Sequence, residues 1–242
     1  MIIRNVIYFV LPTCLLLLPF VFFVLFDGEP FYFNKESGAV ENITAVILAL
    51  ALLLTVSIFF QYRKKTEFLM RDSNSAIPFR GFTLGWLVVY GLGCIYFLGE
   101  EISWGQHLFN WSTPDAWLAV NDQQETNLHN TSALLDQVPR FLLTLGIVIG
   151  GLIYPVCVRN QQPGDSGFSS LLSLIMPSFH CVTAASTVLL ITVHDKIYSL
   201  LQIDMPTFLQ INDGEVKESL IAMFILVYIY DLYQRLKSNK HL

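Results

Sequence analysis

Carboxylate, imidazole and amide side chains concentrate in one stretch of the sequence, residues 99–130. Glu100 and Glu101 are adjacent, and Glu125 and His129 are spaced i, i+4, which places two side chains on one face of a helix. A carboxylate and an imidazole at that spacing can share a divalent ion, and this donor set suits zinc or manganese. We therefore predict a divalent metal site, zinc or manganese, held by Glu100, Glu101 and His129.

The same residues could carry acid–base chemistry. A metal lowers the pKa of a bound water, and a nearby carboxylate can accept the proton of that water. In this hypothesis Glu101 and Glu125 are the catalytic residues, with Glu125 as the general base. Further candidates are the polar neighbours Ser103, Gln106, His107, Asn127 and Asn130.

Two simpler interpretations of this stretch stay open. The acids of an exposed loop can be merely solvated, and the hydroxyl and amide side chains can satisfy a non-helical backbone at membrane depth. However, no Lys or Arg occurs from Gly81 to Pro139, so the segment contains no basic partner for its acids. A bound cation would supply that partner.

One candidate lies outside this stretch. His180 follows Pro177 by three residues, near the middle of an apolar segment. It is either a proton relay or ligand, or a buried neutral imidazole bonded to a neighbouring helix. The string Pro177-Ser178-Phe179-His180 is similar to an element of integral-membrane lipid phosphatases, but the basic elements that accompany it in that family are missing here.

The composition of the chain indicates the environment in which these residues lie. The chain has 242 residues, of which 54% are hydrophobic and 14% charged, and its mean hydropathy is +0.54. Soluble domains carry about 25% charged residues, so an ordinary soluble enzyme is excluded. The net charge of −5 also excludes a nucleic-acid binder, which needs a basic face.

Apolar runs of nearly twenty residues can cross a bilayer as helices. We predict an all-α, polytopic membrane helix bundle with about six transmembrane helices, forming a single integral membrane domain over residues 1–242. The six segments are Val6–Phe26, Ile43–Phe60, Phe82–Leu98, Phe141–Val158, Leu171–Val193 and Ser219–Tyr233.

The basic residues predict the orientation, because short loops rich in Lys and Arg stay in the cytoplasm. With both termini cytoplasmic, ten of the fourteen Lys and Arg residues fall on the inner side. The loop at 99–138 is then extracytoplasmic. We expect a multi-pass protein of the plasma (inner) membrane.

The polar stretch also resembles a known pattern. Glu-Glu-Ile-Ser-Trp-Gly-Gln from Glu100, followed by Glu-Thr-Asn-Leu-His-Asn from Glu125, is similar to a block in uncharacterised multi-pass prokaryotic membrane proteins. The resemblance covers Gly99 to Asn130. It emphasises the same residues and implies no particular chemistry.

Two classes of function follow. The first is a metal-assisted hydrolase or transferase that acts on a lipid or lipid-linked substrate at the extracytoplasmic interface. The alternative is a non-enzymatic component, such as a channel, a carrier or an anchor subunit, with a membrane-protein partner or as a homo-oligomer. A channel would show a polar stripe along several spans, whereas this chain concentrates its polar groups at one depth, which favours the enzyme.

Overall fold

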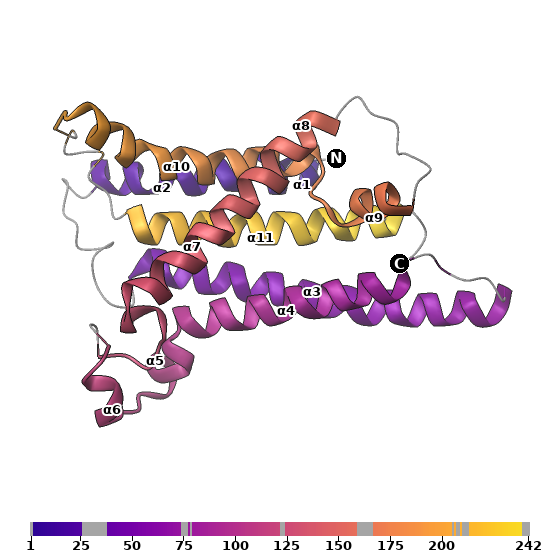
Figure 1. The fold of residues 1–242 in the computed structure, drawn as a ribbon, viewed down its shortest axis with the longest axis horizontal. Helices are drawn as coiled ribbons and strands as arrows, with labels where there is room; N and C mark the ends of the chain where they lie inside the picture. The colour runs from indigo at the N-terminus through magenta and orange to yellow at the C-terminus, as the bar shows by residue number, and fades with distance from the viewer. Residues whose placement is uncertain are drawn as a thin grey trace.

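The apolar segments form long helices that run side by side along one axis of the molecule (Figure 1). The computed structural model describes residues 2–25, 38–73, 77, 79–121, 124–158, 167–204, 206, 209 and 213–238. Within these residues the regular elements are all helical. The long ones are α2 (Leu11–Leu25), α3 (Ala39–Ser73), α4 (Arg80–Glu101), α7 (Ala133–Ile147), α10 (Val182–Leu201) and α11 (Asp213–Ser238).

Short elements extend or connect these helices. The segments α1 (Ile2–Asn5) and η1 (Val6–Val10) precede α2, and η5 (Val148–Ile153) and α8 (Tyr154–Val158) continue α7. The remaining short elements are η3 (Ser103–Gly105), α5 (Gln106–Phe109), α6 (Asp115–Leu118), η4 (His129–Thr131), α9 (Gly167–Ile175) and η6 (Phe179–Cys181).

Five helical segments in the described part of the chain are long and apolar enough to cross a membrane: Ile2–Leu25, Ala39–Arg71, Arg80–Glu101, Ala133–Val158 and Leu171–Tyr198. Large apolar side chains on their outer faces, such as Leu53, Val89 and Phe141, are exposed. Such surfaces require an apolar solvent. The prediction of an all-helical membrane protein is confirmed to this extent.

The sixth predicted span forms α11, which has 26 residues but is not among the five. It carries Glu215, Glu218 and Asp231 within its length. These charges are kept away from lipid because α11 lies at the centre of the bundle, in contact with α2, α3 and α10 (Figure 1). Glu218 and Asp231 are also paired, with Arg140 and Arg235. Its apolar side chains, including Leu220 and Leu232, are fully buried and form the core.

The fifth predicted span is not one continuous helix. It is interrupted at Met176–Ser178, between α9 and η6. Pro177 cannot donate a backbone hydrogen bond, and the Ser178 side chain accepts a hydrogen bond from the backbone N–H of His180, capping the next helix. His180 lies within the candidate span Leu171–Tyr198, at the start of the helix that follows this interruption.

Both ends of the described chain lie at the same end of the bundle, and α5 and α6 of the polar segment lie at the opposite end (Figure 1). This arrangement requires an even number of passes along the axis. It separates the molecule into a terminal end and a polar end, and the candidate residues Glu100, Glu101 and His129 lie at the polar end.

Candidate functional site

The chain turns sharply where α4 ends, and this turn shapes the polar end. Ser103, Trp104 and Gly105 have φ angles of 45°, 53° and 96°. Left-handed backbone is uncommon for residues other than glycine and costs about 1 kcal/mol or more each. The turn brings the Trp104 ring over Gly99, where an added Cβ would lie 2.9 Å from Trp104 Cε3.

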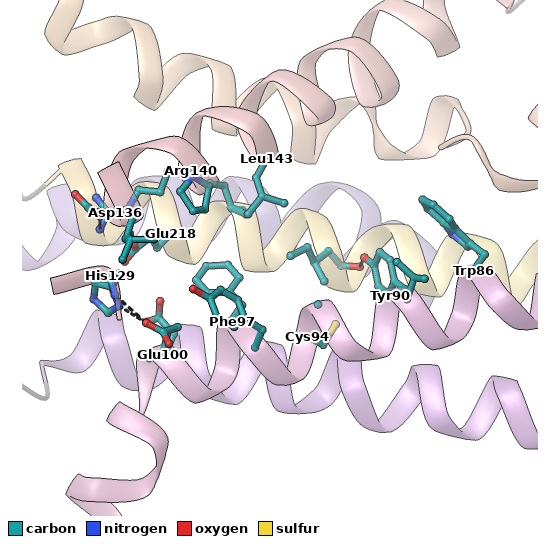
Figure 2. A pocket seen from close by; sticks show the side chains of 18 residues that line it. Trp86, Tyr90, Cys94, Phe97, Glu100, His129, Asp136, Arg140, Leu143 and Glu218 are labelled. Atoms are coloured by element: carbon teal, nitrogen blue, oxygen red, sulfur yellow. Dashed lines mark hydrogen bonds and ion pairs between the residues drawn. The ribbon is translucent and has the colours of Figure 1, made fainter. Parts of the chain in front are cut away.

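Glu100 ties the end of α4 to the returning loop. Its carboxylate accepts hydrogen bonds from the backbone N–H groups of Leu128 at 2.7 Å and His129 at 2.9 Å, and from Trp104 Nε1 at 2.8 Å. His129 Nδ1 lies 3.2 Å from Glu100 Oε2 (Figure 2). The predicted closeness of Glu100 and His129 is thus present in the structure.

The environment of His129 favours its protonated form. Burial alone would lower its pKa, but the hydrogen bond to Glu100 and the charges of Glu218 and Glu100 outweigh burial. The pKa of His129 is therefore raised above its ordinary value.

Glu125 belongs to a separate network inside the loop. Its Oε2 accepts hydrogen bonds from Ser103 Oγ and Asn127 Nδ2, both at 2.6 Å. Its backbone N–H donates to Asn121 Oδ1 at 3.0 Å. Glu125 precedes η4, which begins at His129, so the predicted helix that carries both residues on one face is not formed. Side-chain hydrogen bonds to the backbone hold the loop in an irregular conformation instead.

The other loop candidates also bind within the loop. Gln106 accepts the backbone N–H of Thr126 at 2.8 Å and donates to Thr113 Oγ1 at 2.6 Å. Asn127 donates to Ser103 Oγ at 3.1 Å. Asn130 is half-buried in η4, and the side chain of His107 lies outside the described part of the structure.

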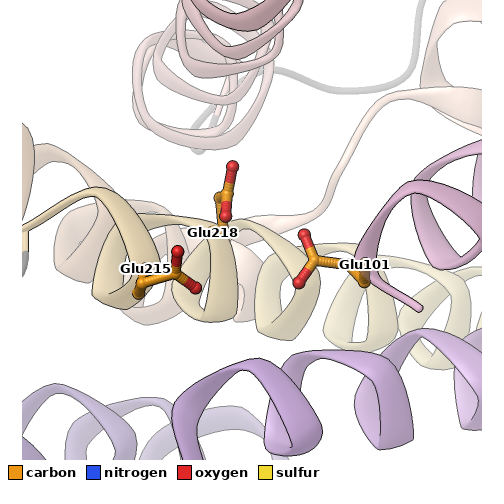
Figure 3. A group of neighbouring side chains, drawn as sticks. All are labelled: Glu101, Glu215 and Glu218. Carbon is orange, nitrogen blue, oxygen red and sulfur yellow. The ribbon is translucent and has the colours of Figure 1, made fainter. Parts of the chain in front are cut away.

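Glu101 faces away from these networks and toward α11. Adjacent residues on an α-helix point about 100° apart, so Glu100 and Glu101 take different partners. The Glu101 carboxylate lies beside Glu215 and Glu218, with one oxygen of each within 4.8 Å of the others (Figure 3). Among the described residues, the structure therefore groups Glu101 with these two acids and not with Glu100 and His129.

Arg140 supplies the nearest positive charge to this acidic group, which we call the triple-Glu cluster (Glu101, Glu215, Glu218). Its Nε lies 2.5 Å from Glu218 Oε1, and its Nη2 lies 2.6 Å from Asp136 Oδ1. Glu101 and Glu218 are only 6% and 7% exposed. One guanidinium thus serves several buried carboxylates, which cannot all ionise without another cation or proton.

A cavity of about 310 Å³ begins at this cluster and extends between α4, α7 and α11. Its polar end is lined by six residues, Glu100, Glu101, His129, Asp136, Arg140 and Glu218. From there Phe97, Cys94 and Tyr90 continue the α4 wall to Trp86 (Figure 2). The distance along α4 from Trp86 to Glu101 is about 22 Å at 1.5 Å per residue.

The far part of the cavity is apolar because its polar atoms are already bonded. Tyr90 donates to the carbonyl of Ile225 at 2.7 Å, and Trp86 Nε1 donates to Tyr228 Oη at 2.7 Å. Val89, which lines the cavity, is 63% exposed on the outer face of α4. The cavity, called the lateral groove below, therefore opens sideways between α4 and α7.

Comparison with protein-family models, curated proteins and solved structures gives no match for this chain. The lateral groove combines a long apolar wall with one polar end, and the triple-Glu cluster lies at that end.

Sequence reasoning missed Glu215 and Glu218. Their signal was available: two acids at i, i+3 begin the last apolar segment, on the same predicted side of the membrane as the polar stretch. His180, by contrast, lies with Asp231, near the end of α11 opposite Glu218. Thirteen residues of helix separate Asp231 from Glu218, about 20 Å, so His180 is not part of this site.

Proposed function

We propose that this membrane protein is a metal-assisted hydrolase or transferase that acts on a lipid or lipid-linked substrate at the extracytoplasmic surface. The observation that carries the proposal is the lateral groove, which is apolar over most of its length and has acids, an imidazole and a guanidinium at one end only. An amphiphile has the same division between tail and headgroup. Polar groups at one depth also fit an enzyme better than a conducting path.

The groove matches the tail of such a substrate in position as well as in chemistry. It lies between helices whose outer faces are apolar, and it opens sideways at Val89. A tail could enter from the bilayer without crossing water. The headgroup would then meet the triple-Glu cluster and Arg140.

The triple-Glu cluster fits a divalent cation. Glu101 is only 6% exposed and lines the groove beside two further carboxylates, Glu215 and Glu218. Three carboxylate oxygens form a hard donor set, which favours manganese over zinc because zinc prefers nitrogen and sulfur ligands. A cation held there would supply a Lewis acid and a bound water of lowered pKa.

The residues of the chain divide the remaining work. His129 lines the groove and is held by Glu100, an arrangement that orients an imidazole for proton transfer. Arg140 is placed to contact an anionic part of the headgroup. Glu125 is not among the residues that line the groove, so in this proposal it fixes the loop. His129, whose protonated form is favoured, is the general acid.

Manganese binding tests the proposal directly. Purified protein in detergent is titrated with Mn²⁺, and bound metal is measured by calorimetry and elemental analysis. We expect about one ion per chain in the wild type and at least tenfold weaker binding in Glu101→Gln and in Glu218→Gln. Asp115→Asn, which removes an exposed carboxylate of α6, is the matched control and should bind as the wild type does.

Two results would contradict this assignment. Failure of the wild type to bind manganese would exclude a manganese site at the triple-Glu cluster. Equal weakening in all three variants would show only a general effect of surface charge. Either result, combined with lipid bound in the groove, would favour a carrier over an enzyme.

A further inference from the structure

A second cavity, of about 450 Å³, lies at the terminal end of the bundle. It is bounded by the N-terminal helix, the start of η6 and the last turns of α11. Arg4, His180, Arg235 and Lys237 line it, together with Ser178 and Asp231. The residues come from three segments far apart in sequence, and the interruption at Pro177 is what brings Ser178 and His180 there.

Asp231 organises the floor of this terminal cavity. Its carboxylate accepts hydrogen bonds from Ser178 Oγ at 2.7 Å and from the Ser178 backbone N–H at 3.2 Å. Arg235 Nε lies 3.0 Å from Asp231 Oδ2. Asp231 is only 2% exposed, so its charge is already compensated by these neighbours.

The Arg235 guanidinium is held by hydrogen bonds, but one of its nitrogens has no acceptor within the described residues. Its Nη1 donates to the carbonyls of Ser173 at 2.9 Å and Leu174 at 2.8 Å. Its Nη2 is buried and has no hydrogen-bond partner within the described residues. A buried donor without an acceptor costs about 1–3 kcal/mol, so the guanidinium keeps unused hydrogen-bonding capacity beside the cavity.

His180 is packed on one face of its ring and exposed to the cavity elsewhere. Its ring stacks on Tyr8, with centroids 4.8 Å apart and planes 25° apart. Its side chain remains 49% exposed, and its Nδ1 lies 3.1 Å from Ser178 Oγ. The same nitrogen lies 3.8 Å from Asp231. A nucleophilic triad needs the acid and the serine on different nitrogens, so this cluster is arranged for binding rather than for attack.

The charges in the terminal cavity favour an anion. Arg4, Arg235 and Lys237 face a single carboxylate, Asp231, which is already bonded. Guanidinium and ammonium groups together with a histidine are the usual partners of phosphate oxygens. Basic pockets between transmembrane helices at a bundle end are suited to lipid headgroups.

We propose that the terminal cavity binds a phosphate group, either that of a lipid headgroup or that of a free phosphate. Arg4 and Lys237 provide two positive charges, and Arg235, which lines the same cavity, provides a third. The site is distinct from the triple-Glu cluster, because about 20 Å of α11 separates Asp231 from Glu218.

The test uses the full chain in detergent at about 150 mM salt. Three probes are titrated: short-chain phosphatidic acid, short-chain phosphatidylcholine and inorganic phosphate. The double variant Arg4→Gln/Lys237→Gln removes two charges of the cavity. Its matched control, Lys64→Gln/Lys65→Gln, removes two exposed charges from α3 at the same end of the bundle.

We expect the wild type and the control to bind a phosphate probe alike, and the cavity variant to bind it at least tenfold more weakly. If phosphatidic acid binds and inorganic phosphate does not displace it, the ligand of the cavity is a lipid headgroup. If inorganic phosphate binds as tightly as phosphatidic acid, the ligand is a free phosphate. The proposal is overturned if neither phosphatidic acid nor inorganic phosphate binds, or if phosphatidylcholine binds as tightly as those two probes. It is also overturned if the two double variants weaken binding equally.

Discussion

Glu100 and Glu101 are adjacent in sequence, but their surroundings are opposite in character. Glu100 accepts three hydrogen bonds from protein donors, whereas Glu101 lies among other carboxylates. The first carboxylate therefore holds the structure together, and the second is stable only with a compensating cation or proton. The difference follows from the 100° rotation between successive helical residues.

Replacing Glu100 should destabilise the fold. In Glu100→Gln the backbone N–H groups of Leu128 and His129 lose a charged acceptor, and such bonds contribute about 1.5–3 kcal/mol each. We expect a clear fall in Tm by fluorescence-detected unfolding in detergent. Glu101→Gln should leave Tm unchanged or raise it, because it removes like-charge repulsion. A larger loss in Glu101→Gln than in Glu100→Gln would contradict these roles.

The ion pair between His129 and Glu100 predicts a pH dependence. Because the pKa of His129 is raised in the folded state, its contribution to stability is complete below the unfolded pKa of about 6.5. That contribution is lost as pH rises through the folded pKa. We expect the stability difference between wild type and His129→Gln to shrink as pH rises from about 6 to 9. A difference that does not change with pH would exclude the pairing.

At the scale of elements, α4 and α7 border a groove that no other described helix fills. The α4 wall includes Gly93, which lines the groove and has no atom within 4 Å of the position of an added Cβ. Gly85 on the same helix has the same open space but does not line the groove. The two glycines allow the groove to be blocked without disturbing the packing of α4.

Gly93→Phe should therefore prevent a lipid tail from entering. We expect the variant to lose most of the lipid that co-purifies with the wild type, measured by mass spectrometry after extraction, and to keep its Tm. Gly85→Phe places the same side chain on a lipid-facing surface and should retain the lipid. Equal retention by both variants would show that the groove is not the binding site.

At the scale of the whole molecule, the sequence predicts features that depend on local pattern better than features that depend on helix packing. The apolar segments correspond to helices, and Glu100 and His129 meet because the polar loop folds back over a short distance. The triple-Glu cluster could not be predicted from local pattern, because it forms only where α11 passes beside the end of α4. Glu125 and His129 fit a helical spacing, but hydrogen bonds from Ser103 and Asn127 hold the loop in another conformation.

The two ends of the bundle differ in charge, and this difference predicts its orientation. Basic residues gather at the terminal end, where Arg80 contacts Glu67 and Arg235 contacts Asp231. Because loops rich in Lys and Arg remain in the cytoplasm, we expect the terminal end inside and the triple-Glu cluster outside. This orientation would present the polar end of the lateral groove to the outer leaflet.

Cysteine labelling tests the orientation. In a background in which the four native cysteines are replaced, Asp115→Cys places a thiol on α6 at the polar end and Lys64→Cys places one on α3 at the terminal end. A membrane-impermeant maleimide added to spheroplasts should label Asp115→Cys at once and Lys64→Cys only after the membrane is permeabilised. The reverse pattern would put the triple-Glu cluster in the cytoplasm, and the substrate would then have to come from the inner leaflet.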